Sequence, residues 1–296
     1  MNSSYFRLKR RIAAKKASIA VVGLGYVGLP LAVEFAKKGF QVTGIDLDKE
    51  RVERIRKKIS YITDVSAIDL KRVIGLKKFE AEGSFLALRE ADVVFVCVPT
   101  PLKRKASPDI SFILGAMKEI RKYLHAGQLI ILESTTYPGT TEEEILPLLE
   151  VSGFSCGKDF FLAFSPERID PGNENYPLEK IPKVIGGITG EATDLAGMLY
   201  KNIVGKVVPV SSARVAETVK LLENTFRIVN IGLIDEIAQM AHKMNINIWE
   251  VIDAASTKPF GFMSFYPGPG VGGHCIPKDP LYLYWKAKKF GFRSRF

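Results

Sequence analysis

Short apolar runs alternate with segments of helical periodicity through residues 18–210. Residues 18–22 and 41–45 are compact and rich in β-branched side chains, as buried strands are, and residues 29–38 between them have the spacing of a helix. Further strands are predicted at residues 92–98, 129–132, 160–164, 183–185 and 206–210, with helices at 48–58, at 111–124 and between the last two strands. This alternation predicts an α/β fold, with a Rossmann-like, doubly wound and mostly parallel sheet.

Three segments of this half are less regular. Residues 1–16 are basic but lack the apolar core of a signal peptide, so we expect a solvated leader or a short helix before the first strand. Residues 59–83 show no clear period and are expected to wrap the surface. Thr141 and Glu144 have the spacing of a capping box, which predicts that a helix begins there.

The pattern changes from Ser212 onwards. Apolar residues recur at helical spacing to Met244, and Gly232 is the single glycine in that stretch. This predicts one long helix over residues 212–244, a second from an Asn247 cap to residue 255, and a last one over 281–290. The chain is therefore expected to consist of a Rossmann domain at residues 1–211 and an all-helical central domain at 212–296.

A glycine-rich turn follows the first predicted strand. Gly23, Gly25 and Gly28 have the Gly-x-Gly-x-x-Gly spacing between a strand and a helix, and Asp46 ends the next strand. In this context the motif predicts a dinucleotide site, with the pyrophosphate at the helix N-terminus and the acid on the ribose hydroxyls. Asp46 would repel the 2′-phosphate of NADP, so NAD is the expected cofactor.

Residues 268–280 form a second stretch of unusual composition, with four glycines and three prolines. It predicts a loop of fixed backbone around Cys275, with Lys278 and Asp279 just downstream. A thiol near a cation can act as a nucleophile, although a tight turn with a buried cysteine has the same composition. On the long helix, Lys220 and Asn224 are four residues apart and share a face, where they are either functional or simply solvated.

Composition excludes several classes of protein. No apolar run approaches the roughly 20 residues of a membrane span, and the three cysteines have no metal-ligand spacing, which favours a reducing cytoplasm. The 42 basic residues exceed the 32 acidic ones, but they are interspersed and form no recognisable nucleic-acid module. The surplus suits an anionic small substrate at least as well.

Six motifs in order along the chain resemble the UDP-glucose/GDP-mannose dehydrogenase family. They lie at residues 22–32, 98–102, 133–135, 165–167, 220–225 and 272–279. The resemblance implies oxidation of a UDP-sugar's primary alcohol to the uronic acid in two NAD-dependent steps, in polysaccharide biosynthesis. It implies that Cys275 is the nucleophile, that Lys220 and Asn224 stabilise an oxyanion, that Asp279 and Thr135 activate water, and that Glu167 is an acid–base group.

The expected binding residues are then as follows. NAD would contact Gly23, Gly25, Tyr26, Val27, Gly28, Asp46, Arg51, Pro99, Thr100, Ser134 and Thr135. The UDP-sugar would contact Glu167, Arg168, Lys220, Asn224, Tyr266, Gly270 and Gly272. The resemblance also implies a homodimer through the long helix.

Two departures from the family pattern refine these expectations. UDP-glucose dehydrogenases usually carry a second glutamate four residues after the position of Glu167, and this chain has Pro171 there. The chain is in this respect most similar to the members that oxidise UDP-N-acetylglucosamine, with the mannosamine epimer or UDP-glucose as alternatives. The third, UDP-binding domain of the family is expected to be missing, so the chain is either a truncated enzyme or an inactive NAD-binding and dimerisation fragment. A 3-hydroxy-acid dehydrogenase, which shares the plan of a Rossmann domain and a long helix, is a weaker alternative.

Overall fold

The computed structural model describes residues 3–104, 107–169, 176–273 and 276–294. The chain divides into two compact units: Met1–Pro101 with Asp109–Thr218, and Leu102–Pro108 with Val219–Phe296. The division lies inside the long helix, a few residues beyond the boundary expected from the sequence, and residues 102–108 group with the second unit.

The first unit is built on one eight-stranded sheet with the order β3-β2-β1-β4-β5-β6-β7-β8. Among the described residues, neighbouring strands are parallel except for β6 and β7, which are antiparallel. This confirms the Rossmann-like, mostly parallel sheet predicted from the sequence. The strands are β1 Ser18–Val22, β2 Gln41–Ile45, β3 Phe79–Glu82, β4 Val93–Val96, β5 Leu129–Leu132, β6 Phe161–Phe164, β7 Lys183–Gly187 and β8 Val207–Pro209.

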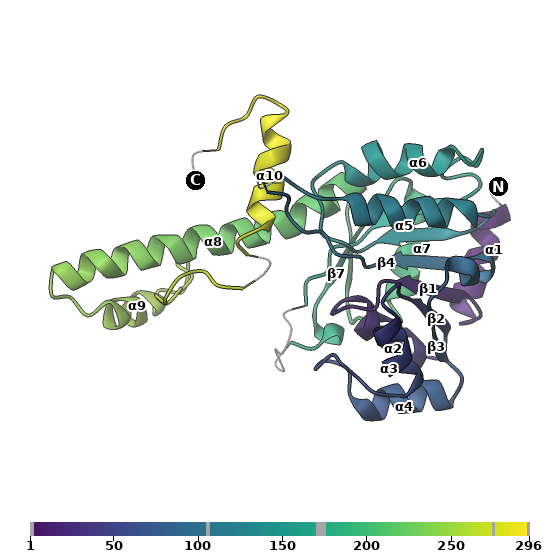
Figure 1. The fold of residues 1–296 in the computed structure, drawn as a ribbon. Helices are drawn as coiled ribbons and strands as arrows, with labels where there is room; N and C mark the ends of the chain where they lie inside the picture. The colour runs from purple at the N-terminus through teal and green to yellow at the C-terminus, as the bar shows by residue number, and fades with distance from the viewer. Residues whose placement is uncertain (1–2, 105–106, 170–175, 274–275, 295–296) are drawn as a thin grey trace. The chain divides into compact units, whose positions relative to one another are not determined.

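Helices cover both faces of this sheet, which is why the central strands are apolar on both sides. Figure 1 shows α5 and α6 together on one side and α2, α3 and α4 on the other. The helices are α1 Ser3–Ala13, α2 Gly28–Lys37, α3 Lys49–Arg56, α4 Ala67–Gly75, α5 Ser111–Lys122, α6 Leu146–Glu150 and α7 Gly190–Tyr200, with short helical turns at Phe85–Glu90, Thr140–Ile145 and Leu178–Lys180.

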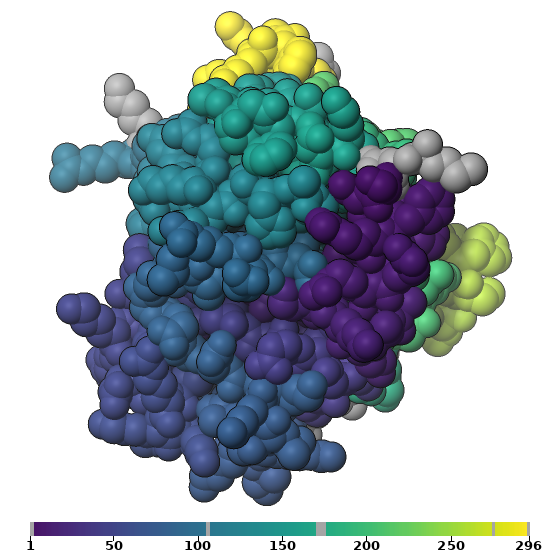
Figure 2. Space-filling view, turned by 90° about the vertical axis from the view of Figure 1, so that its right-hand side faces the viewer, coloured from purple at the N-terminus to yellow at the C-terminus, as the bar shows by residue number. Residues whose placement is uncertain are grey.

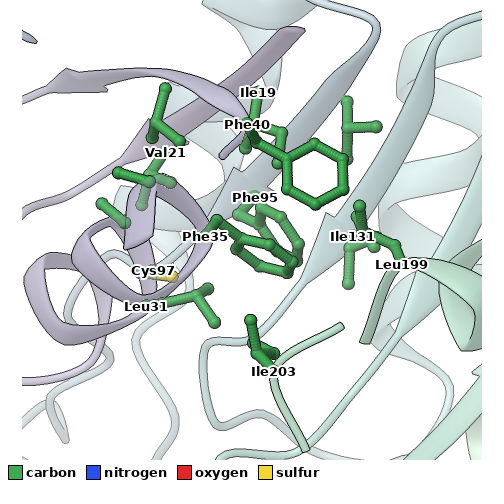
Figure 3. Close-up of a cluster of buried hydrophobic side chains, with 14 of the residues drawn as sticks. Ile19, Val21, Leu31, Phe35, Phe40, Phe95, Cys97, Ile131, Leu199 and Ile203 are labelled. Atoms are coloured by element: carbon green, nitrogen blue, oxygen red, sulfur yellow. The ribbon is translucent and has the colours of Figure 1, made fainter. Parts of the chain in front are cut away.

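Aromatic side chains fill the core on the face of α2 and α7. The Phe35 ring of α2 stacks on Phe95 of β4 with centroids 5.2 Å apart, and Tyr200 of α7 meets Phe95 edge-on at 5.7 Å. Figure 3 shows Phe35 and Phe95 at the centre of this cluster, with the Cys97 sulfur close to Leu31. Burial raises the pKa of the Cys97 thiol, and the nearby Glu133 carboxylate raises it further. This cysteine is part of the core, as predicted.

The expectation of a solvated N-terminal leader was wrong, and the alternative of a short helix was right. Helix α1 buries Leu8 and Ile12 in the main core, and the space-filling view shows its residues lying against the rest of the first unit (Figure 2). The sequence hid this because basic residues dominate the segment, whereas only one face of the helix is apolar. Residues 59–83 were also interpreted incompletely, since they contain helix α4 and the edge strand β3.

The predicted capping box at Thr141 and Glu144 does not form. Gly139 precedes the helical turn in a left-handed conformation (φ 94°), and Glu144 instead accepts a hydrogen bond from the Tyr137 hydroxyl. The cap comes from Glu217, near the start of the long helix. Its carboxylate accepts hydrogen bonds from the backbone N–H groups of Gly139 (2.5 Å) and Thr141 (2.8 Å) and from the Thr141 hydroxyl (2.7 Å). Glu217, which is distant in the sequence, therefore provides the cap that was predicted to come from Thr141 and Glu144.

The second unit is helical, as predicted. The long helix α8 spans Ala213–Lys243, and α9 (Ile248–Ser256) and α10 (Asp279–Lys288) follow. The Asn247 side chain caps α9 by accepting a hydrogen bond from the Trp249 N–H. A small cluster of Ile234, Ala241, Ile248 and Ile252 joins α8 to α9. In the part of the chain that the structure describes, no helix combines the length and the hydropathy needed to cross a membrane.

Candidate functional site

The glycine turn between β1 and α2 is packed at two of its three glycines. A side chain at Gly23 would come within 2.5 Å of the Cys97 carbonyl oxygen, and one at Gly28 within 1.8 Å of the Gly23 carbonyl oxygen. At Gly25, by contrast, no described atom lies within 4 Å of where a Cβ would stand. The closest constraint on Gly28 is thus the turn itself. Gly25 leaves open the space that a pyrophosphate would need at the N-terminus of α2.

Asp46, at the end of β2, is buried (9% exposed) and braces the same turn. Its Oδ2 accepts a hydrogen bond from the Leu24 N–H at 2.8 Å, and its Oδ1 accepts one from the Asp48 N–H at 2.9 Å. Arg51, from α3, approaches the same carboxylate at 3.4 Å. The carboxylate is thus held in place before any ribose hydroxyl arrives.

Tyr61 is a support that sequence reasoning missed. Its hydroxyl donates a hydrogen bond to the Leu24 carbonyl oxygen at 2.7 Å, so the turn is held from both the N–H and the C=O of one residue. Burial raises the pKa of the Tyr61 hydroxyl, and the neighbouring Asp46 charge adds to the effect, which keeps the phenol protonated as a donor. Tyr61 lies in the stretch without a clear period, so no local pattern marked it.

The other predicted cofactor residues follow strands at the same edge of the sheet. Because β1, β2, β4 and β5 are parallel, Pro99, Thr100, Ser134 and Thr135 lie beyond the same ends of their strands as the glycine turn. The Ser134 hydroxyl donates to the Val98 carbonyl oxygen at 2.8 Å, so it joins two neighbouring strand ends. Tyr26 is 66% exposed and Val27 is partly buried. These residues therefore lie at the same edge of the sheet as the glycine turn.

Glu167 lies just past β6 and is almost completely enclosed. Its Oε1 accepts hydrogen bonds from the backbone N–H groups of Arg168 (2.6 Å) and Ile169 (2.7 Å). Its Oε2 accepts one from the Lys183 ammonium at 3.1 Å. The Arg168 guanidinium donates to the Pro182 carbonyl oxygen at 2.8 Å, which ties the loop to the residue before β7.

Lys183 also binds a second carboxylate, Glu133, at 2.7 Å, and the Tyr200 hydroxyl donates to that same carboxylate. Burial raises the pKa of Glu133 to about 7 even though Lys183 opposes the shift. Burial alone would lower the pKa of Lys183, but the two carboxylates outweigh it and the pKa is raised. Sequence reasoning missed Glu133, Lys183 and Tyr200 as site residues, because each stands beside apolar strand or helix residues that explain it as packing.

In the second unit, two residues predicted to be catalytic are in direct contact. The Asn224 side-chain amide, on α8, donates a hydrogen bond to Asp279 Oδ2 at 2.6 Å. Asp279 is the first residue of α10 and is 4% exposed. Lys220 lies one helical turn before Asn224 and is partly buried. The predicted nucleophile Cys275, like Pro171, lies outside the described residues.

The glycine-rich stretch before Cys275 does have an unusual backbone. Gly270 (φ 129°) and Gly272 (φ 55°) adopt conformations that favour glycine. The loop is tied to the unit by the Gly268 N–H, which donates to Asp235 at 2.9 Å, and by the Tyr266 hydroxyl, which donates to Asp253 at 2.8 Å. Tyr266 is thereby fixed on the side of α9, and the backbone at Gly268 is fixed to α8.

Comparison with known proteins identifies the family. Residues 17–204 match the NAD-binding domain, and residues 214–296 the central domain, of the UDP-glucose/GDP-mannose dehydrogenase family. The chain is 43% identical over 281 residues to a UDP-N-acetyl-D-glucosamine 6-dehydrogenase from Pseudomonas aeruginosa, covering 94% of this chain and 65% of that protein. It is 40% identical over 273 residues to a UDP-N-acetyl-D-mannosamine dehydrogenase from Pyrococcus horikoshii, covering 92% and 65%.

A solved structure agrees with these matches. The structure of the UDP-D-ManNAc dehydrogenase from Pyrococcus horikoshii superimposes with a TM-score of 0.86 at 40% identity, over 92% of this chain and 65% of that one. The chain thus spans about 65% of the length of these relatives. The glycine turn, the buried acid after β2 and the two domain matches lead to one conclusion. The chain belongs to the UDP-glucose/GDP-mannose dehydrogenase family, and it carries that family's NAD-binding domain.

Proposed function

We propose that this chain is the NAD-binding and central part of an enzyme that oxidises the primary alcohol of a UDP-N-acetylhexosamine to the uronic acid. UDP-N-acetylglucosamine is the substrate we favour, and UDP-N-acetylmannosamine is the alternative. The support is that similar proteins are named for one or the other sugar, and both sugars are N-acetylated. We place the reaction in the cytoplasm, as a supply of uronic acid units for polysaccharide synthesis.

The contact between Asn224 and Asp279 carries this proposal. The Asn224 amide and the Asp279 carboxylate come from two different helices and meet at 2.6 Å. Asp279 lies four residues after Cys275 in the sequence. Asp279 is 4% exposed, and burying a carboxylate is costly unless hydrogen bonds compensate for it, so its place beside the Asn224 amide favours a functional role. The pair is suited to orient an amide towards an oxyanion and a carboxylate towards water.

The proposed chemistry assigns each step to a residue. NAD, when bound, accepts a hydride at each of the two oxidations. The Cys275 thiolate adds to the sugar aldehyde and forms a thiohemiacetal, whose oxidation leaves a thioester. Lys220 and the Asn224 amide stabilise the oxyanion at each stage. Asp279 and Thr135 orient the water that attacks the thioester, and Glu167 takes the proton from that water. Cys275 then leaves as thiolate and the uronic acid is released.

We also propose that the chain pairs with a second copy through the exposed face of α8. Leu222, Phe226 and Leu233 are all large, exposed apolar residues on this helix, and a two-fold contact between identical helices would cover them. Leu222→Glu should shift the protein towards monomer in light scattering. Leu76→Glu is the matched control, since Leu76 in the first unit is equally exposed at 62%. A monomer in the parent protein at micromolar concentration would contradict the proposal.

The assay for the proposed function is NADH formation with UDP-N-acetylglucosamine, UDP-N-acetylmannosamine and UDP-glucose. It is run on this chain and on the chain joined to the C-terminal third of the Pseudomonas aeruginosa relative, because the chain spans about 65% of that protein. We expect two NADH per sugar from the joined protein. Binding of NAD without any NADH formation would instead support a non-catalytic, cofactor-binding fragment.

Substitution of Cys275 separates the two oxidation steps. Cys275→Ala should release aldehyde and make no uronic acid, whereas Cys275→Ser should form a slowly hydrolysed ester that mass spectrometry detects as a sugar-nucleotide adduct. If Cys275→Ala makes the uronic acid at the parent rate, the covalent mechanism is refuted. That result would also reopen the comparison with 3-hydroxy-acid dehydrogenases, which need no cysteine.

A further inference from the structure

The reversed strand β7 brings a cation to an edge of the sheet where the parallel strands place acids. In the antiparallel pairing of β6 and β7, Ala163 lies opposite Gly187 and Phe164 opposite Gly186. Continuing the same register places Lys183, the first residue of β7, opposite Glu167. In a parallel strand the first residue would lie at the far edge of the sheet. Glu133 follows β5, the other neighbour of β6, so it ends at the same edge.

The three side chains make a buried ionic cluster. Lys183 Nζ lies 2.7 Å from Glu133 Oε2 and 3.1 Å from Glu167 Oε2, and the exposed fractions of Lys183, Glu133 and Glu167 are 2%, 1% and 6%. Lys183 also lies over the Tyr200 ring, 5.1 Å from its centroid. One ammonium group therefore serves two carboxylates almost out of contact with water.

The charges of this cluster do not balance when both carboxylates are ionised. Tyr200 and Cys97 face the cluster from α7 and from beyond β4, and burial raises the pKa of both, so they stay neutral. The Arg168 guanidinium, next to Glu167 in sequence, donates to the Pro182 carbonyl oxygen. Two carboxylates close to one cation repel each other, so one of them binds a proton more readily while the other is ionised. With the pKa of Glu133 at about 7, that proton enters near neutral pH.

We infer that Glu133 is a positioning residue that acts on Glu167 through Lys183: the carboxylates share one buried ammonium, and the ionised Glu133 keeps Glu167 able to accept a proton from water. The inference rests on the proposed acid–base role of Glu167. Without Glu133, the ammonium and two backbone N–H groups would all stabilise the Glu167 carboxylate, and it would be a poor base. With Glu133 ionised, Lys183 is shared and Glu167 retains basicity. Protonation of Glu133 below neutral pH switches this effect off.

The coupling can be measured on the 296-residue chain without any turnover. Infrared spectroscopy of chain labelled with ¹³C-glutamate follows buried carboxyl groups as the pH changes. Glu217 is the second buried glutamate whose pKa is raised to about 7, so Glu217→Gln is introduced first to leave the Glu133 signal. In this background, Glu167→Gln should lower the midpoint of Glu133 by about one pH unit, because a negative neighbour has gone. Lys183→Met should move it in the opposite direction.

A purely structural ion pair gives a different result. In that case Glu133 titrates near pH 7 because of burial alone, and Glu167→Gln leaves its midpoint in place. Such a result would overturn the inference. Far-UV circular dichroism and NAD titration establish that each variant has folded. Tyr200→Phe is the conservative variant if the charge substitutions unfold the chain, since it removes only the hydroxyl that donates to Glu133. It should raise the Glu133 midpoint.

The joined protein described above then tests whether the coupling is used. The acidic limb of kcat against pH should lie near the Glu133 midpoint, and in Tyr200→Phe it should move to higher pH together with that midpoint. In Glu133→Gln the acidic limb should vanish and the plateau rate should be lower, with KM for NAD unchanged. A limb that stays fixed while the Glu133 midpoint moves would refute the positioning role. If the joined protein oxidises no UDP-sugar, the proposed function fails by itself, and the infrared titration still decides whether the carboxylates are coupled.

Discussion

The first unit and the second unit hold their functional side chains by different means. In the first unit, backbone N–H groups hold the key carboxylates: Leu24 donates to Asp46, Arg168 to Glu167, and Gly139 to Glu217. In the second unit, Asn224 and Asp279 hold each other side chain to side chain. The core between α8 and α9 is also small. Backbone donors are fixed by the fold, whereas a side-chain pair can be lost without disturbing its helices. Loss of the backbone geometry at the glycine turn should therefore abolish NAD binding, whereas loss of a proposed catalytic side chain in the second unit should slow the chemistry.

The largest effect is expected for Gly28→Ala. The new methyl group would stand 1.8 Å from the Gly23 carbonyl oxygen, which is backbone and cannot move aside. We expect NAD binding to vanish and unfolding to become easier by more than about 4 kcal/mol. The control lies in the second unit: Gly232→Ala, on α8 with open space around it, should stabilise the protein by roughly 0.5–1 kcal/mol. Calorimetric titration with NAD and urea unfolding measure both. Parent-like affinity in Gly28→Ala would contradict this account of the turn.

Lys220→Ala tests the second unit. Removing one oxyanion donor should slow turnover of the joined protein by roughly a hundred- to a thousandfold, with NAD affinity unchanged because Lys220 lies outside the first unit. Gln239→Ala, farther along the same helix and exposed, is the matched control and should retain the parent rate. Equal slowing in both variants would mean that the helix, rather than the ammonium group, was disturbed.

The third effect is a dependence of stability on pH through Glu217. Burial raises the pKa of Glu217 to about 7 from its ordinary value of 4.5. Between these two values the folded chain binds a proton that the unfolded chain has released, so the contribution of Glu217 to stability is fully present below pH 4.5 and is lost as the pH rises through 7. The loss amounts to at most about 3 kcal/mol. Glu217→Gln should flatten the slope of unfolding free energy against pH, and an unchanged slope in urea titrations between these values would show that Glu217 is not the group responsible.

The smallest effect concerns the choice of cofactor. Asp46 would face the 2′-phosphate of NADP, so NAD should bind more tightly than NADP, and Asp46→Ala should narrow the difference roughly tenfold. The variant also loses the hydrogen bond to the Leu24 N–H, so affinity for NAD itself should fall a little. Glu80→Ala, an acid on the edge strand β3, serves as control. Equal affinities of the parent chain for the two cofactors would refute the role of Asp46.

Local patterns predicted much of this molecule, and long-range pairings account for the failures. The central strands and helices stood out because burial on one or both faces leaves a periodic trace, as in residues 129–132 or along α8. Edge strand β3 did not, since its alternating glutamates resemble a loop. Glu217 capped a turn 76 residues away at Thr141, which no local signal could announce. Sequence reasoning missed the ionic cluster of Glu133, Glu167 and Lys183 for the same reason, because that cluster depends on the direction of β7.

A buried cluster of ion-paired side chains also restricts which substitutions the protein can accept at those positions. The exposed pair of Glu53 and Lys57 can lose either member for less than about 1 kcal/mol. Loss of Lys183 alone would remove the ammonium group that two buried carboxylates share. Loss of Glu133 alone would change the charge around Glu167. Positions 133, 167 and 183 are therefore expected to vary together among descendants of this sequence.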